Sequence, residues 1–223
     1  MTTTTRAVRN AAPEGFDANP GRGRFNSVFF YVMGGFINLN MHKHKKKVFA
    51  DLPVDVVEIG SGVGANLRYL PPGARLTAIE PNPYMHKRLR RAARRRGVEL
   101  EIRSVVGERI DLPDGSADAV ISSLVLCTVG DPAAVLAEVR RVLRAGGRFS
   151  FAEHVVGKPH TFTRLTQRVL RRPWAWVFEG CSCERDLAGL IESAGFAHVD
   201  LAPYRIHSPF VPFNTHIAGT AIA

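Results

Sequence analysis

The chain has 223 residues, 45% of them hydrophobic and 22% charged, and 30 lysines and arginines against 20 acidic residues give a formal charge of +10. These values indicate one globular domain and exclude a chain that is disordered throughout. The longest largely apolar stretch, residues 28–37, is too short to cross a bilayer. Three cysteines without a secretory signal predict reduced thiols and a cytoplasmic location. Cys181 and Cys183 alone are too few for zinc, so we expect no metal.

The chain begins with a segment rich in threonine, proline and glycine, which we interpret as a flexible tail over residues 1–24. Residues 25–223 are predicted to form a single domain, which opens with one or two apolar helices over 25–52 that we interpret as a lid. Strands and helices alternate after that, which predicts an open α/β sheet. The expected strands are 54–59, 75–79, 98–106, 118–123, 148–155, 199–206 and 216–222, with helices over 83–96 and from Asp131 to Gly146-Gly147, and a less regular helical region over 161–195.

A glycine-rich loop follows the first strand and leads into the next segment as Gly60-x-Gly62-x-Gly64. Glycine lets the backbone approach a ligand closely, and such a loop suits a nucleotide. Glu80 ends the second strand, where a carboxylate can accept both ribose hydroxyls. These features fit both a dinucleotide and S-adenosylmethionine. Glu58, at the end of the first strand, favours the second ligand, because a carboxylate there attracts an ammonium group and repels a pyrophosphate.

A further carboxylate, Glu108, follows the third strand, where it can accept the adenine amino group while the backbone amide of Arg109 meets the ring. With these residues the chain resembles class I S-adenosylmethionine-dependent methyltransferases of the ubiquinone type. The motifs that carry the resemblance are Val57-Glu58-Ile59-Gly60-Ser61-Gly62-Val63-Gly64, Ile79-Glu80-Pro81-Asn82, Gly107-Glu108-Arg109, Leu112-Pro113-Asp114-Gly115-Ser116 and Val142-Leu143-Arg144-Ala145-Gly146-Gly147.

The resemblance implies a Rossmann-like α/β fold with a seven-stranded sheet in the order 3-2-1-4-5-7-6 and an antiparallel last strand. It also implies which residues hold the cofactor. The three loop glycines would approach its methionine part, Glu80 its ribose and Glu108 its adenine. The full set of expected cofactor-binding residues is Glu58, Gly60, Gly62, Gly64, Glu80, Pro81, Asn82, Glu108, Arg109, Ser122 and Ser123.

A narrower resemblance is to the mammalian membrane-anchored alkyl-thiol methyltransferases, over about residues 40–222. Its segments include Leu124-Val125-Leu126-Cys127, Glu153-His154-Val155, Gly180-Cys181 and His216-Ile217. We find no counterpart of their hydrophobic N-terminal anchor, which leaves contact with a membrane surface open. This resemblance implies a thiol as the methyl acceptor.

Two residues are candidates for roles at the methyl group. Cys127 follows the fourth strand and His154 ends the fifth, so both lie at the edge of the sheet where ligands bind. Each also has a purely structural interpretation, as a small buried side chain or a satisfied histidine. A thiol with a pKa near 8.5 is partly ionised at neutral pH and does not require a strong base. Aromatic residues nearby, namely Phe29, Phe30, Phe36, Phe162, Trp174, Trp176 and Phe178, are candidates for an apolar pocket.

We therefore predict methyl transfer to a small lipophilic or secondary-metabolite thiol. Oxygen, nitrogen or carbon methylation of a phenol, quinol or lipid amine stays open as the alternative. Methylation of RNA, a non-catalytic cofactor-binding role and a dehydrogenase are less favoured. The arginine-rich segment 86–96 suits anionic partners, but base-methylating enzymes often carry an Asn/Asp-Pro-Pro-aromatic motif where this chain has Ser122-Ser123-Leu124-Val125, so we expect no nucleic acid. The oligomeric state is not predicted.

Overall fold

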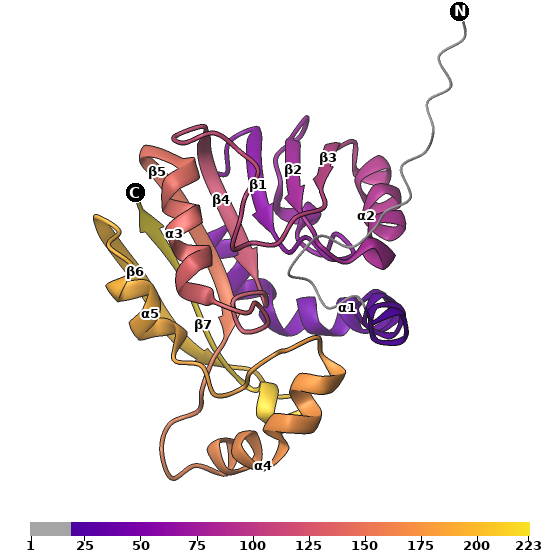
Figure 1. Cartoon of the computed structure of the whole chain (residues 1–223), viewed down its shortest axis with the longest axis vertical. Coiled ribbons are helices and arrows are strands. Elements are labelled where there is room, and N and C mark those ends of the chain that lie inside the picture. Colours follow the sequence, from indigo (N-terminus) through magenta and orange to yellow (C-terminus); the bar gives the residue numbers. More distant parts are fainter. Residues whose placement is uncertain (1–18) are drawn as a thin grey trace, which may run out of the picture.

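The computed structural model describes residues 19–223 and contains a seven-stranded sheet with helices on both faces (Figure 1). The strand order is β3-β2-β1-β4-β5-β7-β6, in which β1 to β5 are parallel and β7 is antiparallel to both of its neighbours. The predicted sheet order and its antiparallel last strand are thus confirmed. The strands are β1 (Asp55–Ile59), β2 (Arg75–Ile79), β3 (Glu99–Arg103), β4 (Ala117–Ser123), β5 (Leu143–His154), β6 (His198–Arg205) and β7 (Thr215–Ile222).

The central strands β1 and β4 are buried on both faces, as expected for continuous runs of apolar residues in a parallel sheet. On one face they pack against α1 (Pro20–Val48) and α2 (Pro83–Arg96), and on the other against α3 (Pro132–Val142) and α5 (Leu187–Ser193). The remaining elements are α4 (Phe162–Val177) and the short 3-10 helices η1 (Leu67–Tyr69) and η2 (Val211–Phe213). Residues 19–223 contain no helix that is both long and apolar enough to span a membrane.

Local signals in the sequence explain where α2 and α3 begin. The side chain of Asn82 accepts a hydrogen bond from the Tyr84 amide, and Asp131 accepts from the amides of Ala133 and Ala134, so that each side chain caps the helix that follows it. Helix α3 ends at Val142, before the expected Gly146-Gly147. Its last turn gives way to the start of β5, which pairs with the beginning of β4.

The N-terminal helix α1 is longer than the predicted lid and is a single helix. It begins at Pro20, five residues before the expected start at 25, because Asn19 caps it by accepting from the Arg22 amide and proline is favoured in a first turn. It continues through Gly34 and Gly35 to Val48. The boundary at residue 24 therefore moves to 19, and the rest of the predicted tail lies outside the described residues.

Candidate functional site

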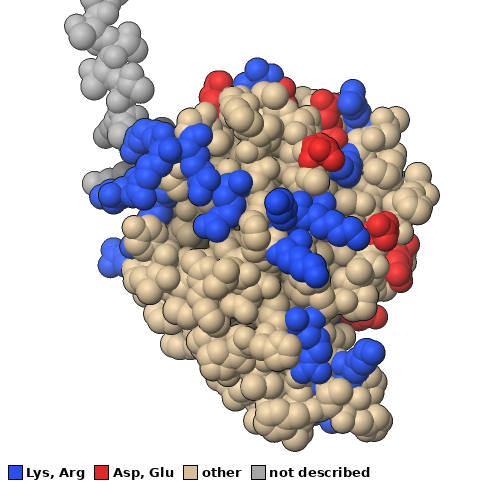
Figure 2. Space-filling view, turned by 180° about the vertical axis from the view of Figure 1, so that it is seen from behind, with Lys and Arg blue, Asp and Glu red and all other residues tan. Residues whose placement is uncertain are grey.

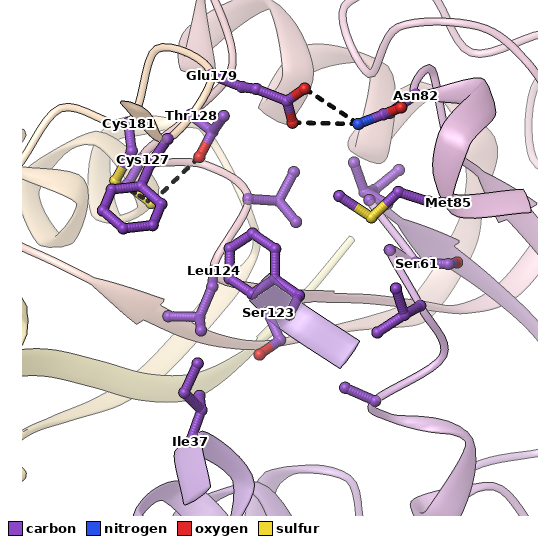
Figure 3. A pocket seen from close by; sticks show the side chains of 18 of the residues that line it. Ile37, Ser61, Asn82, Met85, Ser123, Leu124, Cys127, Thr128, Glu179 and Cys181 are labelled. Atoms are coloured by element: carbon purple, nitrogen blue, oxygen red, sulfur yellow. Dashed lines mark hydrogen bonds between the residues drawn. The ribbon is translucent and has the colours of Figure 1, made fainter. Parts of the chain in front are cut away.

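A cavity of about 440 Å³ lies at the carboxyl ends of β1, β2 and β4. Its walls come from the loops that follow these strands, from α1, and from the end of α4 with the loop after it. In Figure 3, Ser61, Asn82 and Met85 lie on one side of it, and Cys127 and Cys181 on the other. The cavity thus joins a polar end beside the glycine loop to an end bordered by sulfur and aromatic side chains.

The three glycines of the loop after β1 serve two different purposes. Gly60 and Gly62 line the cavity with φ angles of +62° and +55°, which side chains rarely adopt. A Cβ atom at Gly60 would also collide with the side chain of Val125. Gly64 does not line the cavity; with φ at +88°, it lets the loop pack against Leu67 and Leu89. Two of the three glycines therefore line the cavity, and the third permits close packing.

The Glu80 carboxylate is held in place by backbone amides from two loops. Its Oε2 atom accepts from the Gly62 amide at 2.7 Å and its Oε1 atom from the Asn82 amide at 2.9 Å. Each oxygen keeps a further lone pair, and Glu80, Pro81 and Asn82 all line the cavity. Burial raises the pKa of Glu80 to about 7. Asn82 also donates to the Glu179 carboxylate at 3.0 Å, which links the start of α2 to the loop after α4 (Figure 3).

The structure places Glu58 behind the cavity wall and connects it to the cavity through two other residues. Its Oε1 atom accepts from Asn66 Nδ2 at 2.7 Å, and Asn66 Oδ1 accepts from Lys45 Nζ at 2.9 Å. Asn66 and Lys45 line the cavity, and Glu58 does not. Burial raises the pKa of Glu58 and lowers that of Lys45 to about 8. Helix α1 thus brings two basic residues to the cavity, Arg22 and Lys45, and the sequence analysis singled out neither.

The carboxylate of Glu108 lines the cavity, and its Oε1 atom accepts from the Asp131 amide at 3.2 Å. The neighbouring Arg109 is exposed, and its backbone amide donates to the Val106 carbonyl at 3.2 Å within the turn. Strand β3 ends at Arg103, earlier than expected, so that Val106 and Gly107 turn into the cavity wall.

Only one of the two expected serines at the end of β4 reaches the cavity. Ser123 lines it, and Ser122 is buried behind it, where its Oγ atom donates to Glu153 Oε1 at 2.6 Å. Glu153 Oε2 in turn accepts from the amides of Val125 and Leu126 at 2.9 and 3.1 Å. Burial raises the pKa of Glu153 to about 7. This carboxylate, given no role in the sequence analysis, fixes the loop after β4.

An unpartnered hydroxyl indicates that the cavity is suited to a polar ligand. The Ser123 hydroxyl is buried, lines the cavity and has no hydrogen-bond partner among the described residues, whereas the Ser61 hydroxyl faces the Glu58 carboxylate. Buried hydroxyls normally have partners, so Ser123 indicates where a polar ligand would bind. Together with the Gly60 backbone and the Glu80 lone pairs it fits a nucleoside with a charged amino-acid tail.

At the other end of the cavity, the thiols of Cys127 and Cys181 lie 3.5 Å apart and both line the wall. His154 lies behind them, where its Nδ1 atom is 3.9 Å from Cys181 Sγ and its Nε2 atom is 2.8 Å from the carbonyl oxygen of Pro212. The hydrogen bond with Cys181 and burial raise the pKa of Cys127, and the same bond lowers the pKa of Cys181. The structure therefore brings the two predicted catalytic residues close to each other, with Cys181 between them.

Five of the seven candidate aromatic residues line the cavity: Phe29, Phe30 and Phe36 from α1, Trp174 from α4, and Phe178 directly after it. The other two do not. Phe162 and Trp176 are 70% and 65% exposed on α4. Phe210 and Phe213, near η2, complete the apolar wall. Phe29 and Phe178 meet edge to face with ring centroids 5.2 Å apart, which joins α1 to the end of α4 across the cavity.

Comparison with known proteins agrees with this geometry. Residues 57–151 match the model of the family described as "Methyltransferase domain". The human thiol S-methyltransferase TMT1B is 35% identical over 211 residues, which are 88% of this chain and 86% of that protein. The human thiol S-methyltransferase TMT1A is 36% identical over 197 residues, 83% of this chain and 80% of that protein.

Solved structures support the same fold at lower identity. An S-adenosylmethionine-dependent methyltransferase of Thermotoga maritima superimposes with a TM-score of 0.63 at 19% identity, covering 89% of this chain and 98% of that one. One from Aquifex aeolicus gives 0.61 at 15%, covering 93% and 100%. The family match and the human relatives, together with the glycine loop, establish an S-adenosylmethionine-dependent methyltransferase. Because the human relatives match over most of both chains, this protein belongs to the thiol S-methyltransferase family.

Proposed function

We propose that this enzyme transfers the methyl group of S-adenosylmethionine to the sulfur of a small lipophilic thiol. The observation that carries the proposal is the aromatic cavity that continues from the glycine loop, because an apolar pocket selects an apolar acceptor. The names of the human relatives supply the acceptor atom. We further propose that residues 20–223 work as one methyltransferase domain, with α1 as its cover.

In this proposal the polar end holds the cofactor. Glu80 accepts the ribose hydroxyls with its remaining lone pairs, and Glu108 accepts from the adenine amino group. Gly60 and Gly62 let the methionine part approach the backbone. Lys45, held by Asn66, attracts the cofactor's carboxylate. Pro81, Asn82 and Ser123 complete the wall, whereas Glu58, Gly64 and Ser122 act from behind it and Arg109 supports the turn.

When bound, the cofactor supplies an electrophilic methyl group on a sulfonium. The protein excludes water around it, aligns the acceptor and requires no strong base for a thiol, which is partly ionised at neutral pH. Cys127 is the predicted catalytic residue that borders the cavity. His154 lies behind Cys181 and so acts as a positioning residue, whose Nδ1 atom faces that sulfur.

The proposed acceptor is tested by incubating the purified chain with methyl-labelled cofactor and a panel of alkyl and aryl thiols, phenols, quinols and amines. We expect label in the thiols, and most in the more apolar ones. Phe178→Ala should lower kcat/KM for apolar thiols and leave cofactor affinity unchanged. Trp176→Ala is the matched control, because this exposed aromatic residue lies two positions earlier and does not line the cavity. Label confined to oxygen, nitrogen or carbon acceptors would contradict the proposal.

We also propose that the enzyme contacts an anionic membrane surface near the cavity. Helix α1 exposes Val28, Tyr31, Val32 and Leu39, and α4 exposes Leu165, Val169 and Trp176. Helix α2 adds the exposed side chains Lys87, Arg90, Arg91, Arg94 and Arg95, and Figure 2 shows a cluster of basic side chains at the upper left of the face drawn, with more across its middle. The Arg88 guanidinium lies 5.3 Å from the centre of the Tyr31 ring, so that basic and apolar surfaces adjoin. Apolar area plus positive charge is what interfacial binding requires.

Flotation with vesicles tests this contact. The chain should float with vesicles that contain phosphatidylglycerol and less with pure phosphatidylcholine. Val32→Glu combined with Val169→Glu should abolish flotation, while Val54→Glu, an exposed apolar position just before β1 at the opposite end of the sheet, should not. Equal flotation of both variants would disprove this contact.

A cytoplasmic location is proposed from the free thiols of Cys127 and Cys181, which lie close enough to be joined in an oxidising compartment. Alkylation of unlysed cells, followed by mass spectrometry, should find both thiols reduced. A disulfide between them would count against this location.

A further inference from the structure

Three metal-binding side chains converge at the acceptor end of the cavity. The Sγ atoms of Cys127 and Cys181 and a ring nitrogen of His154 all lie within 4.8 Å of one another, and all three residues are buried. They come from the loop after β4, the loop after α4 and the end of β5, which are separate parts of the sequence. The sequence analysis considered only Cys181 and Cys183 together, whereas the fold places Cys127 and a histidine beside Cys181 and leaves Cys183 out of the cluster.

The spacing of the three atoms is close to that of a tetrahedral zinc site. Bonds of about 2.3 Å to sulfur and about 2.0 Å to nitrogen place two thiolates about 3.8 Å apart, and a thiolate and an imidazole nitrogen about 3.5 Å apart. The observed distances are 3.5 Å between the sulfurs and 3.9 Å between Cys181 Sγ and His154 Nδ1. Modest side-chain adjustment would therefore bring all three onto one ion.

Hydrogen bonds around these groups leave the metal-binding atoms in the form that a metal requires. The Pro212 carbonyl oxygen can only accept, so the 2.8 Å contact means that His154 carries its proton on Nε2 and presents the Nδ1 lone pair to Cys181. A histidine that binds a metal through one ring nitrogen usually donates a hydrogen bond from the other, as His154 does to this carbonyl. Trp174 Nε1 donates to Cys181 Sγ at 3.3 Å, and the Thr128 hydroxyl lies 3.6 Å from Cys127 Sγ. Both sulfurs thus have a neighbour that can donate to a thiolate.

Charge balance favours an ion in this place. A divalent cation with two thiolates and a neutral imidazole has no net charge, which suits a buried position. Two sulfurs and one nitrogen form a donor set typical of zinc. Both sulfurs line the cavity (Figure 3) and His154 does not, so a fourth ligand of the ion would come from the cavity side.

We propose that Cys127, Cys181 and His154 bind one Zn²⁺ ion whose open position takes the sulfur of the acceptor. This inference rests on the proposed function, since it assumes a thiol acceptor. The acceptor thiol releases its proton to solvent and binds as a thiolate. Its lone pair forms the new bond to the methyl carbon, while the bond between that carbon and the cofactor sulfur breaks and leaves its electron pair on that sulfur. The products are a neutral thioether, a poor zinc ligand that leaves, and S-adenosylhomocysteine.

The first measurement is metal content. The full chain, produced with zinc in the medium and passed through a desalting column, should contain about one zinc per chain by plasma mass spectrometry. Cys127→Ser, Cys181→Ser and His154→Gln should each lose most of it. Cys183→Ser is the matched control, because Cys183 is equally buried but lies outside the cluster. Cofactor titration of each variant shows whether it is folded. With Co²⁺ in place of Zn²⁺, only the wild type and the Cys183→Ser control should give a sulfur-to-metal charge-transfer band.

The second measurement separates the metal from the acceptor. At pH 7 only a few per cent of a free thiol is ionised, so removing zinc should slow thiol methylation by roughly thirtyfold, and the loss should shrink above pH 9. Added zinc should restore the rate. A metal-free wild type without a cobalt band, or equal metal in all variants, would overturn the zinc site and leave thiol methylation standing. Bound zinc with only oxygen acceptors methylated would overturn its role on the acceptor.

Discussion

Lys45 and Asn66 meet inside the cavity, where the lysine Nζ atom donates a hydrogen bond of 2.9 Å to the amide oxygen. Lys45 comes from α1, and Asn66 lies between the glycine loop and η1. The contact therefore joins the N-terminal cover to the loop that we propose holds the cofactor. It also places a buried amine, with a pKa lowered to about 8, where the carboxylate of a methionine tail would bind.

Replacing this amine should weaken cofactor binding. Hydrogen bonds to charged groups contribute about 1.5–3 kcal/mol, so Lys45→Met should raise the Kd for S-adenosylmethionine roughly 10- to 100-fold by calorimetric titration. Lys46→Met, an exposed neighbour on the same helix, is the control and should leave the Kd unchanged. Equal affinities for wild type and Lys45→Met would show that the carboxylate binds elsewhere.

Cofactor binding should be sensitive even to Glu80→Gln, a change that keeps the size and shape of the side chain. The backbone amides of Gly62 and Asn82 donate to the two carboxylate oxygens of Glu80. In Glu80→Gln, the side-chain NH₂ group would replace one of these oxygens and face a backbone N–H, so that two donors would oppose each other. Loss of the proposed ribose acceptor adds to this effect. We expect at least a tenfold rise in the cofactor Kd, in keeping with loss of about 1.4 kcal/mol or more. Glu192→Gln, an exposed carboxylate on α5, should bind normally; the same Kd in both variants would refute the role of Glu80.

The collision between Gly60 and Val125 predicts a non-additive pair of mutations. Gly60→Ala should destabilise the protein by roughly 2–4 kcal/mol, because it combines overpacking with a left-handed backbone conformation. Val125→Ala removes the atoms that a Cβ at position 60 would strike. The double variant should therefore recover the overpacking part and keep the backbone part. Chemical denaturation measures all three variants, and purely additive free energies of unfolding would contradict this explanation.

Glu153 should make stability depend on pH between about 4.5 and 7. Its pKa is raised from 4.5 to about 7 by burial, so the folded state holds this proton more tightly than the unfolded state does. Its contribution to stability is therefore present below pH 4.5 and is lost as the pH rises to 7, by up to about 3 kcal/mol. Glu153→Gln cannot ionise and can still accept from the Val125 and Leu126 amides. Its free energy of unfolding relative to wild type should rise from pH 5 to pH 8. A constant difference would show that Glu153 is charged throughout.

Much of the polar end of the cavity could be predicted because its signals are local in sequence. Gly60, Gly62 and Glu80 follow directly after strands, and parallel strands bring such positions to one edge of a sheet. The same reasoning could not separate the glycine that packs, Gly64, from those that face the cavity. That distinction depends on the side chains of η1 and α2 against which Gly64 lies.

The residues that the sequence did not reveal depend on long-range packing. Lys45 is one of four lysines within residues 43–47, and only the rotation of α1 against the sheet decides which one turns inward. Cys181 is 54 residues from Cys127 and meets it through loops of irregular structure. Glu153 points into the loop after β4, a contact that no local pattern encodes.

Helix α1 borders both ends of the cavity, because Lys45 near its C-terminus lies at the polar end and Phe29 and Phe30 in its first half lie at the aromatic end. Redesign of the pocket for bulkier acceptors should therefore have different effects at its two walls, α1 and the end of α4. Substitutions in the first half of α1 that enlarge the pocket would shift the whole helix, and with it Lys45, which we propose binds the cofactor. Enlarging the pocket at Phe178, after α4, would leave the Lys45 contact with Asn66 in place, which makes that wall the better place to broaden the substrate range.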